Sequence, residues 1–206
     1  MFGYGWAEIR PPPVVTDFRN LDAFEGTDGL VTLWKCDLTL LNIDAVVNSV
    51  NTHVAPRGGL CGLICAAAGP EIVGEMQKYN PSPSGTAVIT PGFKLPAKFC
   101  IHAIGPVGRK PEVLEAAYKS ILGCIDGEQI RSVGLCCLSV RSGYYPLEEA
   151  TEIAVAAVHQ FLNDEENRAK VDRIVFVTPN DETTALYEKT MAQHFQREGK
   201  KQSGDV

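Results

Sequence analysis

The sequence has no apolar run of about 20 residues, the length that a helix needs to cross a bilayer. Its first residues, MFGYGWAEIRPPPVV, lack the charged start and apolar core of a secretory signal peptide. An excess of positive charge is also absent, because 19 Lys and Arg stand against 25 Asp and Glu. We therefore expect no membrane partner. We also do not expect this protein to bind long nucleic acid through its phosphates.

Paired cysteine spacing is missing as well. Seven cysteines, an odd number, are scattered along the chain, and four lie in strand-like apolar runs: Cys36, Cys100, Cys136 and Cys137. Neighbouring strand residues face opposite sides, so Cys136 and Cys137 should not share a disulfide or a metal. Cys61, Cys65 and His53 supply three metal ligands without the usual fourth. We predict no metal, no cofactor, and free thiols in a reducing intracellular compartment, cytoplasmic or nuclear.

The 206 residues are 45% hydrophobic and 21% charged, ordinary values for one globular domain. Residues 1–27 hold many Pro, Gly and aromatic residues without periodicity and are expected to form an N-terminal arm. Residues 28–196 are predicted to be the folded domain. Residues 197–206 read as a polar tail.

Between the two ends, strand-like and helix-like segments alternate. Strands are predicted over 30–35, 44–49, 85–90, 98–104, 132–140 and 172–178. Helices are predicted over 63–79, with a break at Gly69-Pro70, over 111–125 and 146–162, and after Asn180 or Asp181. The alternation indicates an α/β domain with helices on both faces of a parallel or mixed sheet. Ligands of such sheets bind at the carboxyl ends of strands.

The stretch AVVNSVNTHVAPRGGLCGLICAAAGPEI, residues 45–72, places two amides and a glycine pair where a strand gives way to a helix. Gly58 and Gly59 allow backbone N–H groups to approach a ligand, and a helix N-terminus attracts phosphate. Asn48 and Asn51 offer the neutral donors and acceptors that sugar hydroxyls need. No Lys follows the glycines, which excludes a P-loop. A tight turn with capping amides would use the same residues, and spacing alone leaves both interpretations open.

A second loop of this kind lies in LSVRSGYYPLEEA, where Ser139, Ser142 and Gly143 separate a buried strand from the clearest helix. Two such loops at one sheet edge could clamp the two phosphates of a pyrophosphate. Asp37 directly follows another strand and could accept a hydrogen bond from an amino group. An acid at such a position is otherwise more often a turn residue or a cap.

Four segments, in order, resemble the macrodomain family, which binds ADP-ribose. They are VTLWKCDLTLLNIDAVVNSVN, GGLCGLICAAAGPEI, GTAVITPGFKLPAKFCIHAIGP and SGYYPLEEATEIA. Together they span roughly residues 30 to 178. The resemblance implies a three-layer α/β/α macrodomain fold with a central mixed sheet. It also implies a ligand cleft at the carboxyl ends of the strands.

The resemblance assigns roles to the residues of both loops. Asp37 would contact the adenine amino group, and Asn48 and Asn51 would face the distal ribose. The glycine pair and the following helix start would line the diphosphate, with residues 139–143 on the other side. The implied ligand contacts are Asp37, Leu38, Asn48, Asn51, Gly58, Gly59, Leu60, Ser139, Val140, Arg141, Ser142, Gly143 and Tyr144.

One departure from the family concerns catalysis. Hydrolytic macrodomains of the MacroD type carry an aspartate ten residues after the second asparagine of N-x-x-N, and here that position is Cys61. A neutral thiol accepts a proton poorly at pH 7, and nearby phosphates oppose the thiolate. The resemblance therefore implies ADP-ribose binding with weak or no hydrolysis. Asn51 and Cys61 are the candidate catalytic residues, although Cys61 reads more simply as a small residue that fits the turn.

Two further departures affect binding. Catalytic relatives usually have S-T-G-x-[YF]-G-Y-P, where this chain has SVRSGYYP at 139–146, so its early glycine is replaced around Arg141. Relatives often have an aromatic residue near the end of the final strand, where this chain has Thr178, Pro179 and Asn180. Two alternatives stay open. The first is an ADP-ribosyl hydrolase or O-acetyl-ADP-ribose deacetylase that uses Asn51 and a substrate-assisted water. The second is weak poly(A) or RNA binding. The expected partner is ADP-ribose or a mono-ADP-ribosylated protein.

Overall fold

A computed structural model describes residues 14–56, 58–140 and 143–195. Its main sheet has six strands in the order β2 (Val31–Lys35), β8 (Arg173–Thr178), β7 (Ser132–Leu135), β4 (Ala45–Val50), β6 (Phe99–Ile104) and β5 (Ala87–Pro91). The first five of these strands are parallel, and β5 runs antiparallel to β6. The predicted mixed sheet is therefore confirmed.

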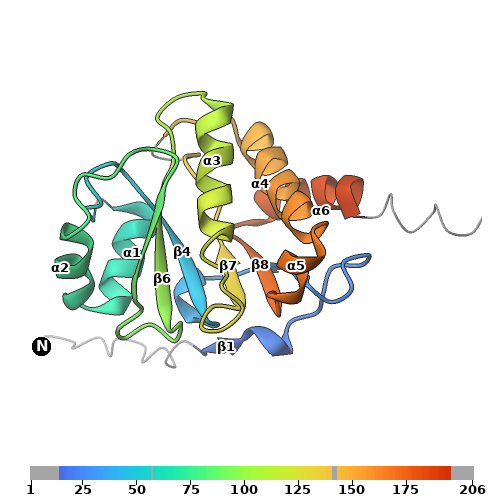
Figure 1. Ribbon diagram of the computed structural model, residues 1–206, viewed down its shortest axis with the longest axis horizontal. Coiled ribbons are helices and arrows are strands. Elements are labelled where there is room, and N and C mark those ends of the chain that lie inside the picture. Colours follow the sequence, from blue (N-terminus) through green and yellow to red (C-terminus); the bar gives the residue numbers. More distant parts are fainter. Residues whose placement is uncertain (1–13, 57, 141–142, 196–206) are drawn as a thin grey trace, which may run out of the picture.

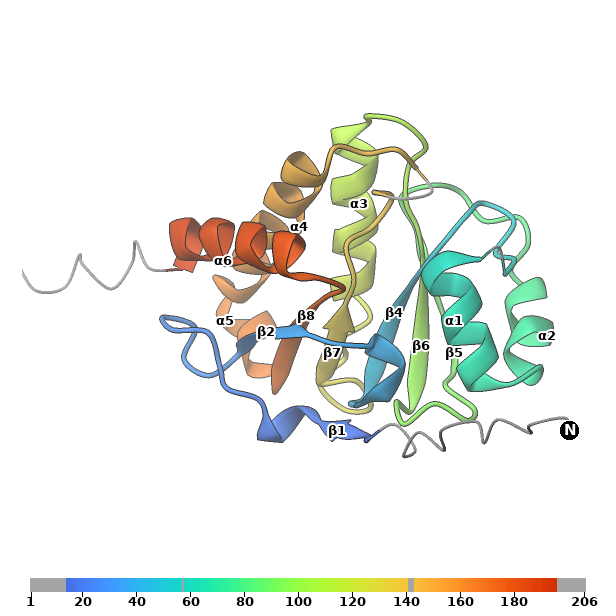
Figure 2. The ribbon, with the colours of Figure 1, turned by 180° about the vertical axis from the view of Figure 1, so that it is seen from behind.

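Helices cover both faces of this sheet. On one face lie α1 (Gly59–Ala68) and α2 (Glu71–Gln77), and on the other lie α3 (Pro111–Leu122) and α4 (Leu147–Leu162), as the two opposite views show (Figure 1, Figure 2). The short α5 (Glu165–Ala169) follows α4, and α6 (Asp181–Phe195) packs against α4 and β2. The predicted three-layer α/β/α fold is confirmed. No helix in the described ranges is both long and apolar enough to cross a membrane.

The helix that carries the glycine pair at its start owes its placement to small apolar residues. Cys61, Ile64, Cys65 and Ala68 are buried at the spacing of one helical face, and α1 packs with this face toward β4. The helix ends at Gly69, whose φ of 92° suits glycine. The predicted break is therefore confirmed, but α1 begins at Gly59 and not at residue 63.

The predicted strand over 132–140 is wrong in its second half, because β7 ends at Leu135. The buried hydroxyl of Tyr118, on α3, donates to the Cys136 carbonyl at 3.3 Å and accepts from the Leu138 N–H at 3.1 Å. The Tyr118 hydroxyl thus forms hydrogen bonds with the Cys136 carbonyl and the Leu138 N–H, which would otherwise pair with a neighbouring strand. The chain after β7 is free to turn toward the sheet edge.

Several small elements were not predicted. They are α5, the 3-10 turns Phe18–Asn20 and Leu38–Leu40, and the parallel pair of β1 (Thr16–Asp17) with β3 (Leu41–Asn42). Strand β1 lies inside the predicted N-terminal arm, of which residues 1–13 are outside the described residues. The domain limits at 27 and 196 stay predictions.

The strand order creates a crevice in the middle of the sheet. From β4 the chain crosses toward β6, whereas from β7 it crosses through α4 toward β8, on the opposite side. Because the two connections leave in opposite directions, the carboxyl ends of β4 and β7 border an open gap. Both predicted ligand loops begin at this gap.

Candidate functional site

A cleft of about 700 Å³ opens at the carboxyl ends of β4, β6 and β7. This volume is in the range of cofactor-sized sites. Three loops and the start of α1 line it: Ser49, Val50, Asn51, Ala55, Gly58, Gly59, Leu60, Cys61, Gly105, Pro106, Val107, Cys137, Ser139, Val140 and Gly143. None of these described lining residues is charged. An anionic ligand would therefore be held by backbone and neutral polar groups.

The glycine pair forms one wall of the cleft. Gly58 and Gly59 have φ values of 51° and 55°, which residues with a side chain rarely adopt. A Cβ at either position would meet nothing within 4 Å, so both backbones face open space. The first N–H groups of α1 have no acceptor within the helix, and its dipole is positive there. This wall is suited to bind phosphate oxygens through main-chain amides.

The opposite wall is formed by Ser139, Val140 and Gly143. The Ser139 carbonyl accepts from the N–H groups of Gly143 at 2.8 Å and Tyr145 at 3.2 Å. Ser139 itself has a φ of 62°. A Cβ at Gly143 would lie 2.5 Å from the Pro106 carbonyl oxygen and 2.6 Å from that of Ser139. Only glycine fits between these two loops.

Asn48 lies beneath the cleft, not on its surface. The side chain is fully buried, and its Nδ2 is 3.1 Å from His102 Nδ1 on the neighbouring strand and 3.5 Å from Cys61 Sγ. His102 Nε2 lies 2.9 Å from Thr90 Oγ1. This network has the neutral imidazole accept from Asn48 and donate to Thr90. The implied contact of Asn48 with the distal ribose stays a prediction. In this structure the Asn48 amide donates a hydrogen bond to the Cys61 sulfur.

Because His102 is buried, we expect the free energy of unfolding to depend on pH. Desolvation lowers the pKa of His102 from 6.5 to about 4. Between these values the unfolded chain binds a proton here and the folded chain does not. The free energy of unfolding should therefore fall by up to about 3 kcal/mol as the pH drops from 6.5 to 4.

Urea titrations of the parent and of His102→Gln between pH 4.5 and 7 measure this effect. The slope of the unfolding free energy against pH over that interval should be clearly shallower in His102→Gln than in the parent. Equal slopes would show that His102 is not the group that titrates. The carboxylates whose pKa is lowered, Asp17, Asp44 and Asp126, lose their contribution at more acidic pH.

Cys61 is the third residue of α1 and lines the cleft. It is 5% exposed, and besides Asn48 its thiol lies 3.9 Å from the Ala55 carbonyl oxygen. A hydrogen bond with Cys61, and then burial, raise the pKa of the Cys65 thiol, which lies one turn further along. No Asp, Glu or His occurs among the described lining residues. The backbone N–H of exposed His53 donates to Asn51 Oδ1 at 2.9 Å.

The structure brings most of the predicted ligand residues together. Those that line the cleft are Asn51, Gly58, Gly59, Leu60, Ser139, Val140 and Gly143, with the candidate Cys61. Asp37 is outside the cleft lining and exposed, and its carboxylate caps the Leu38–Leu40 turn through the Thr39 N–H and Oγ1 at 2.9 and 2.8 Å. Arg141 and Ser142 lie outside the described residues.

Two predicted ligand residues are placed elsewhere. Leu38 is 3% exposed and packs in the core, with its Cδ1 at 3.0 Å from where a Cβ of Gly134 would lie. The Leu38 side chain therefore packs against Gly134 on β7, and its predicted ligand contact stays a prediction. Tyr144 is 85% exposed and does not line the cleft.

The loop after β6, where Gly105, Pro106 and Val107 line the cleft, was not predicted to belong to the site. The signal was present, because IHAIGP was recognised as a strand followed by Gly-Pro. Since β6 lies beside β4, its carboxyl end had to reach the same edge. Cys137 was assigned to a strand and instead lies in the loop after β7.

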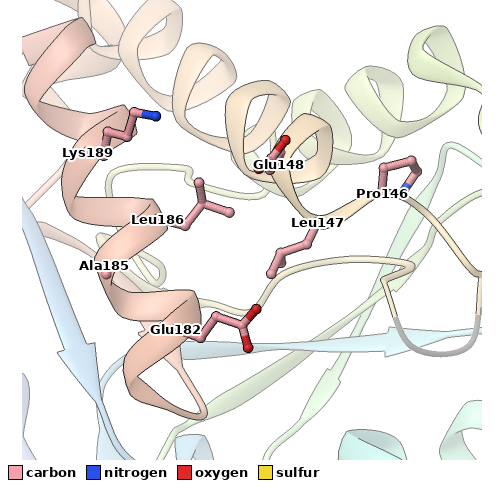
Figure 3. A pocket seen from close by; sticks show the side chains of 7 residues that line it. All are labelled: Pro146, Leu147, Glu148, Glu182, Ala185, Leu186 and Lys189. Atoms are coloured by element: carbon pink, nitrogen blue, oxygen red, sulfur yellow. The ribbon is translucent and has the colours of Figure 1, made fainter.

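A second hollow of about 570 Å³ lies between α4 and α6 (Figure 3). It is lined by Pro146, Leu147, Glu148, Glu182, Ala185, Leu186 and Lys189. Glu148 and Glu182 would repel a phosphate, and no helix start with open glycines faces it. This hollow is therefore a poorer candidate for an anionic ligand than the cleft.

Comparison with known proteins identifies the fold. Residues 47–154 match the model of the Macro domain. The human protein named ADP-ribose glycohydrolase MACROD2 is 37% identical over 171 residues, which are 80% of this chain and 40% of that protein. Rat ganglioside-induced differentiation-associated protein 2 is 33% identical over 182 residues, 85% of this chain and 36% of that protein. The chain thus spans well under half of these relatives.

Solved structures give the same result. A Trypanosoma brucei macrodomain in complex with ADP-ribose has a TM-score of 0.80 and 33% identity, covering 86% of this chain and 77% of that one. The macro domain of ganglioside-induced differentiation-associated protein 2 has a TM-score of 0.82 and 29% identity, covering 90% and 99%. The predicted family is confirmed: this chain belongs to the macro domain family.

Proposed function

We propose that this protein binds ADP-ribose, free or attached to a protein, in the cleft at the carboxyl ends of β4, β6 and β7. One observation carries the proposal: the open backbone of Gly58 and Gly59, at the start of α1, lines a cleft without charged side chains in its described lining, and Ser139, Val140 and Gly143 line the same cleft. The main-chain donors at the start of α1 suit a diphosphate, and the chain after β7 bounds the space that it would occupy. The solved complex of the Trypanosoma brucei relative with ADP-ribose supports the same ligand class.

The sheet order supports one orientation of the ligand. Asp37 stands after the edge strand β2, where its free carboxylate oxygen can accept from the adenine amino group. The diphosphate would lie in the crevice between β7 and β4, and the distal ribose beside Asn51 toward β6. Asn51 has the donors and acceptors to bind ribose hydroxyls.

We propose weak or no hydrolysis, because the cleft lacks a carboxylate among its described residues. A general base must reach the attacking water, and Cys61 is a thiol whose sulfur already neighbours the Asn48 amide. An ADP-ribosyl hydrolase or O-acetyl-ADP-ribose deacetylase that uses Asn51 and a substrate-held water is the second candidate. It is favoured by the similarity to the protein named ADP-ribose glycohydrolase MACROD2.

ADP-ribose should raise the melting temperature of the protein, because a ligand that binds only the folded state stabilises it by mass action. At 100 times the dissociation constant, the gain in unfolding free energy is about 2.7 kcal/mol. Asp37→Asn should remove most of this gain. An asparagine keeps the cap to Thr39 but replaces the second acceptor oxygen with a donor.

Differential scanning fluorimetry with ADP-ribose and with AMP measures this effect, and Asp181→Asn provides the control for loss of an acid at the same sheet edge. Asp181 pairs with Lys35 at the surface. No shift with millimolar ADP-ribose would disprove both binding and hydrolysis. An equal gain in parent and Asp37→Asn would remove Asp37 from the adenine site.

RNA or poly(A) binding through the same cleft is the third candidate. Net charge of −6 and a cleft without charged residues in its described lining count against high affinity for a polyanion. Titration with poly(A) in competition with ADP-ribose separates the two ligands. We also propose a reducing compartment, cytoplasmic or nuclear, which the odd number and scattered spacing of the seven cysteines support.

A further inference from the structure

Two exposed apolar residues belong to the cleft lining or are adjacent to it in sequence: Val107 is itself in the lining, and Tyr144 follows Gly143. Val107 lines the cleft and is 69% exposed, and Tyr144 is 85% exposed. They come from the loops that follow β6 and β7. We call Val107 and Tyr144 the cleft lip.

The two loops of the lip are tied together. The Gly108 N–H donates to the Gly143 carbonyl at 2.8 Å, and Arg109 Nε donates to Glu149 on α4 at 2.7 Å. The close approach of Gly143 to Pro106 leaves no room for a Cβ between the loops. The lip is therefore carried by backbone that cannot shift without losing these contacts.

Tyr144 has a φ of 53°, an uncommon conformation for a bulky residue that costs on the order of 1 kcal/mol or more. Its ring nevertheless contributes little to the protein's own packing, because most of its surface is in water. Aromatic side chains held outward on an ordered backbone bind partners at a low cost in conformational entropy.

The order of strands places Val107 at one end of the cleft. Asp37 follows β2 at one edge of the sheet, the glycine walls lie beside β4 and β7, and Val107 follows β6 beyond them. With the adenine at Asp37, the distal ribose points toward the lip. A group attached to that ribose would leave the cleft beside Val107, and the hydrogen bond from the Gly108 N–H to the Gly143 carbonyl holds the backbone of Tyr144 close to Val107.

From this placement, which rests on the proposed function, we infer that the cleft lip binds apolar side chains beside the modified residue of an ADP-ribosylated polypeptide. Arg109 and Glu149, two charged residues near the lip, pair with each other, and both lip side chains themselves offer apolar contact. The protein thereby selects its partners by the residues that flank the modification, in addition to the nucleotide.

Two synthetic peptides of equal length test this inference. Each carries ADP-ribose on its central residue through a stable linkage, one with leucines on both sides and one with serines. The parent protein should bind the leucine peptide about five-fold more tightly, the gain expected from burying one or two apolar side chains at a rim. In Val107→Ser and Tyr144→Asn this ratio of affinities should fall toward one. Asparagine tolerates the positive φ and removes only the ring.

Phe93→Asn is the matched control. Phe93 is another exposed aromatic residue with a φ of 53°, but it lies between β5 and β6 at the amino edge of the sheet. The ratio should stay at its parent value in this variant. A ratio near one in the parent, or an unchanged ratio in both lip variants, would overturn the inference. Failure of free ADP-ribose to bind would instead disprove the proposed function.

Discussion

Replacing Cys61 with aspartate should create or raise hydrolysis of ADP-ribosyl-aspartate and ADP-ribosyl-glutamate esters by at least about ten-fold, since a positioned general base contributes 10²–10⁴. The position lies at the cleft wall beside Asn51, and the Asn48 amide is 3.5 Å from the present sulfur. That amide can donate to a carboxylate and orient it. The new charge also lies at the positive end of α1.

The measurement is release of ADP-ribose from a mono-ADP-ribosylated peptide, followed with the parent, Cys61→Asp and Cys61→Asn. The asparagine has almost the same shape without the charge, so it should stay at the parent rate. Circular dichroism checks that each variant is folded, because the side chain at this position is buried. A folded Cys61→Asp protein that binds ADP-ribose yet remains inactive would show that more than a carboxylate is missing.

Gly143→Ala should weaken ADP-ribose binding at least ten-fold and lower the free energy of unfolding by about 1–3 kcal/mol. The added Cβ would lie 2.5 and 2.6 Å from two carbonyl oxygens and 2.8 Å from Ser139 Cβ. Two of these neighbours are backbone, so both loops must move apart. The walls of the cleft would then lose their spacing.

Isothermal titration calorimetry with ADP-ribose and urea denaturation measure the two effects. Gly62→Ala is the control, because this glycine lies inside α1 and an added Cβ meets nothing within 4 Å. That variant should gain about 0.5–1 kcal/mol from helix propensity and bind ADP-ribose normally. If Gly143→Ala bound ADP-ribose as tightly as the parent, the two loops would have to be able to move apart without changing the cleft.

The sequence predicted the layers and the two glycine-bearing walls because periodicity and turn residues report local structure. The strand 132–140 failed because the hydroxyl of Tyr118, distant in sequence, pairs with the backbone that would have continued β7. The resemblance placed Asn48 at the distal ribose, and its burial could not be predicted, because alternation along β4 does not tell which polar residue the core accepts. Its partner His102 belongs to another strand. Such contacts depend on strand order, which local patterns do not encode.

The wall formed by Gly58 and Gly59 has a consequence for mutagenesis. Its hydrogen-bond donors belong to the main chain, so alanine scanning leaves every one of them in place. A scan of side chains would therefore not detect the contribution of these main-chain donors to the affinity for phosphate. Amide-to-ester replacement at residues 59–61, which exchanges each N–H for an oxygen, is the chemistry that would reveal how much of the affinity this wall supplies.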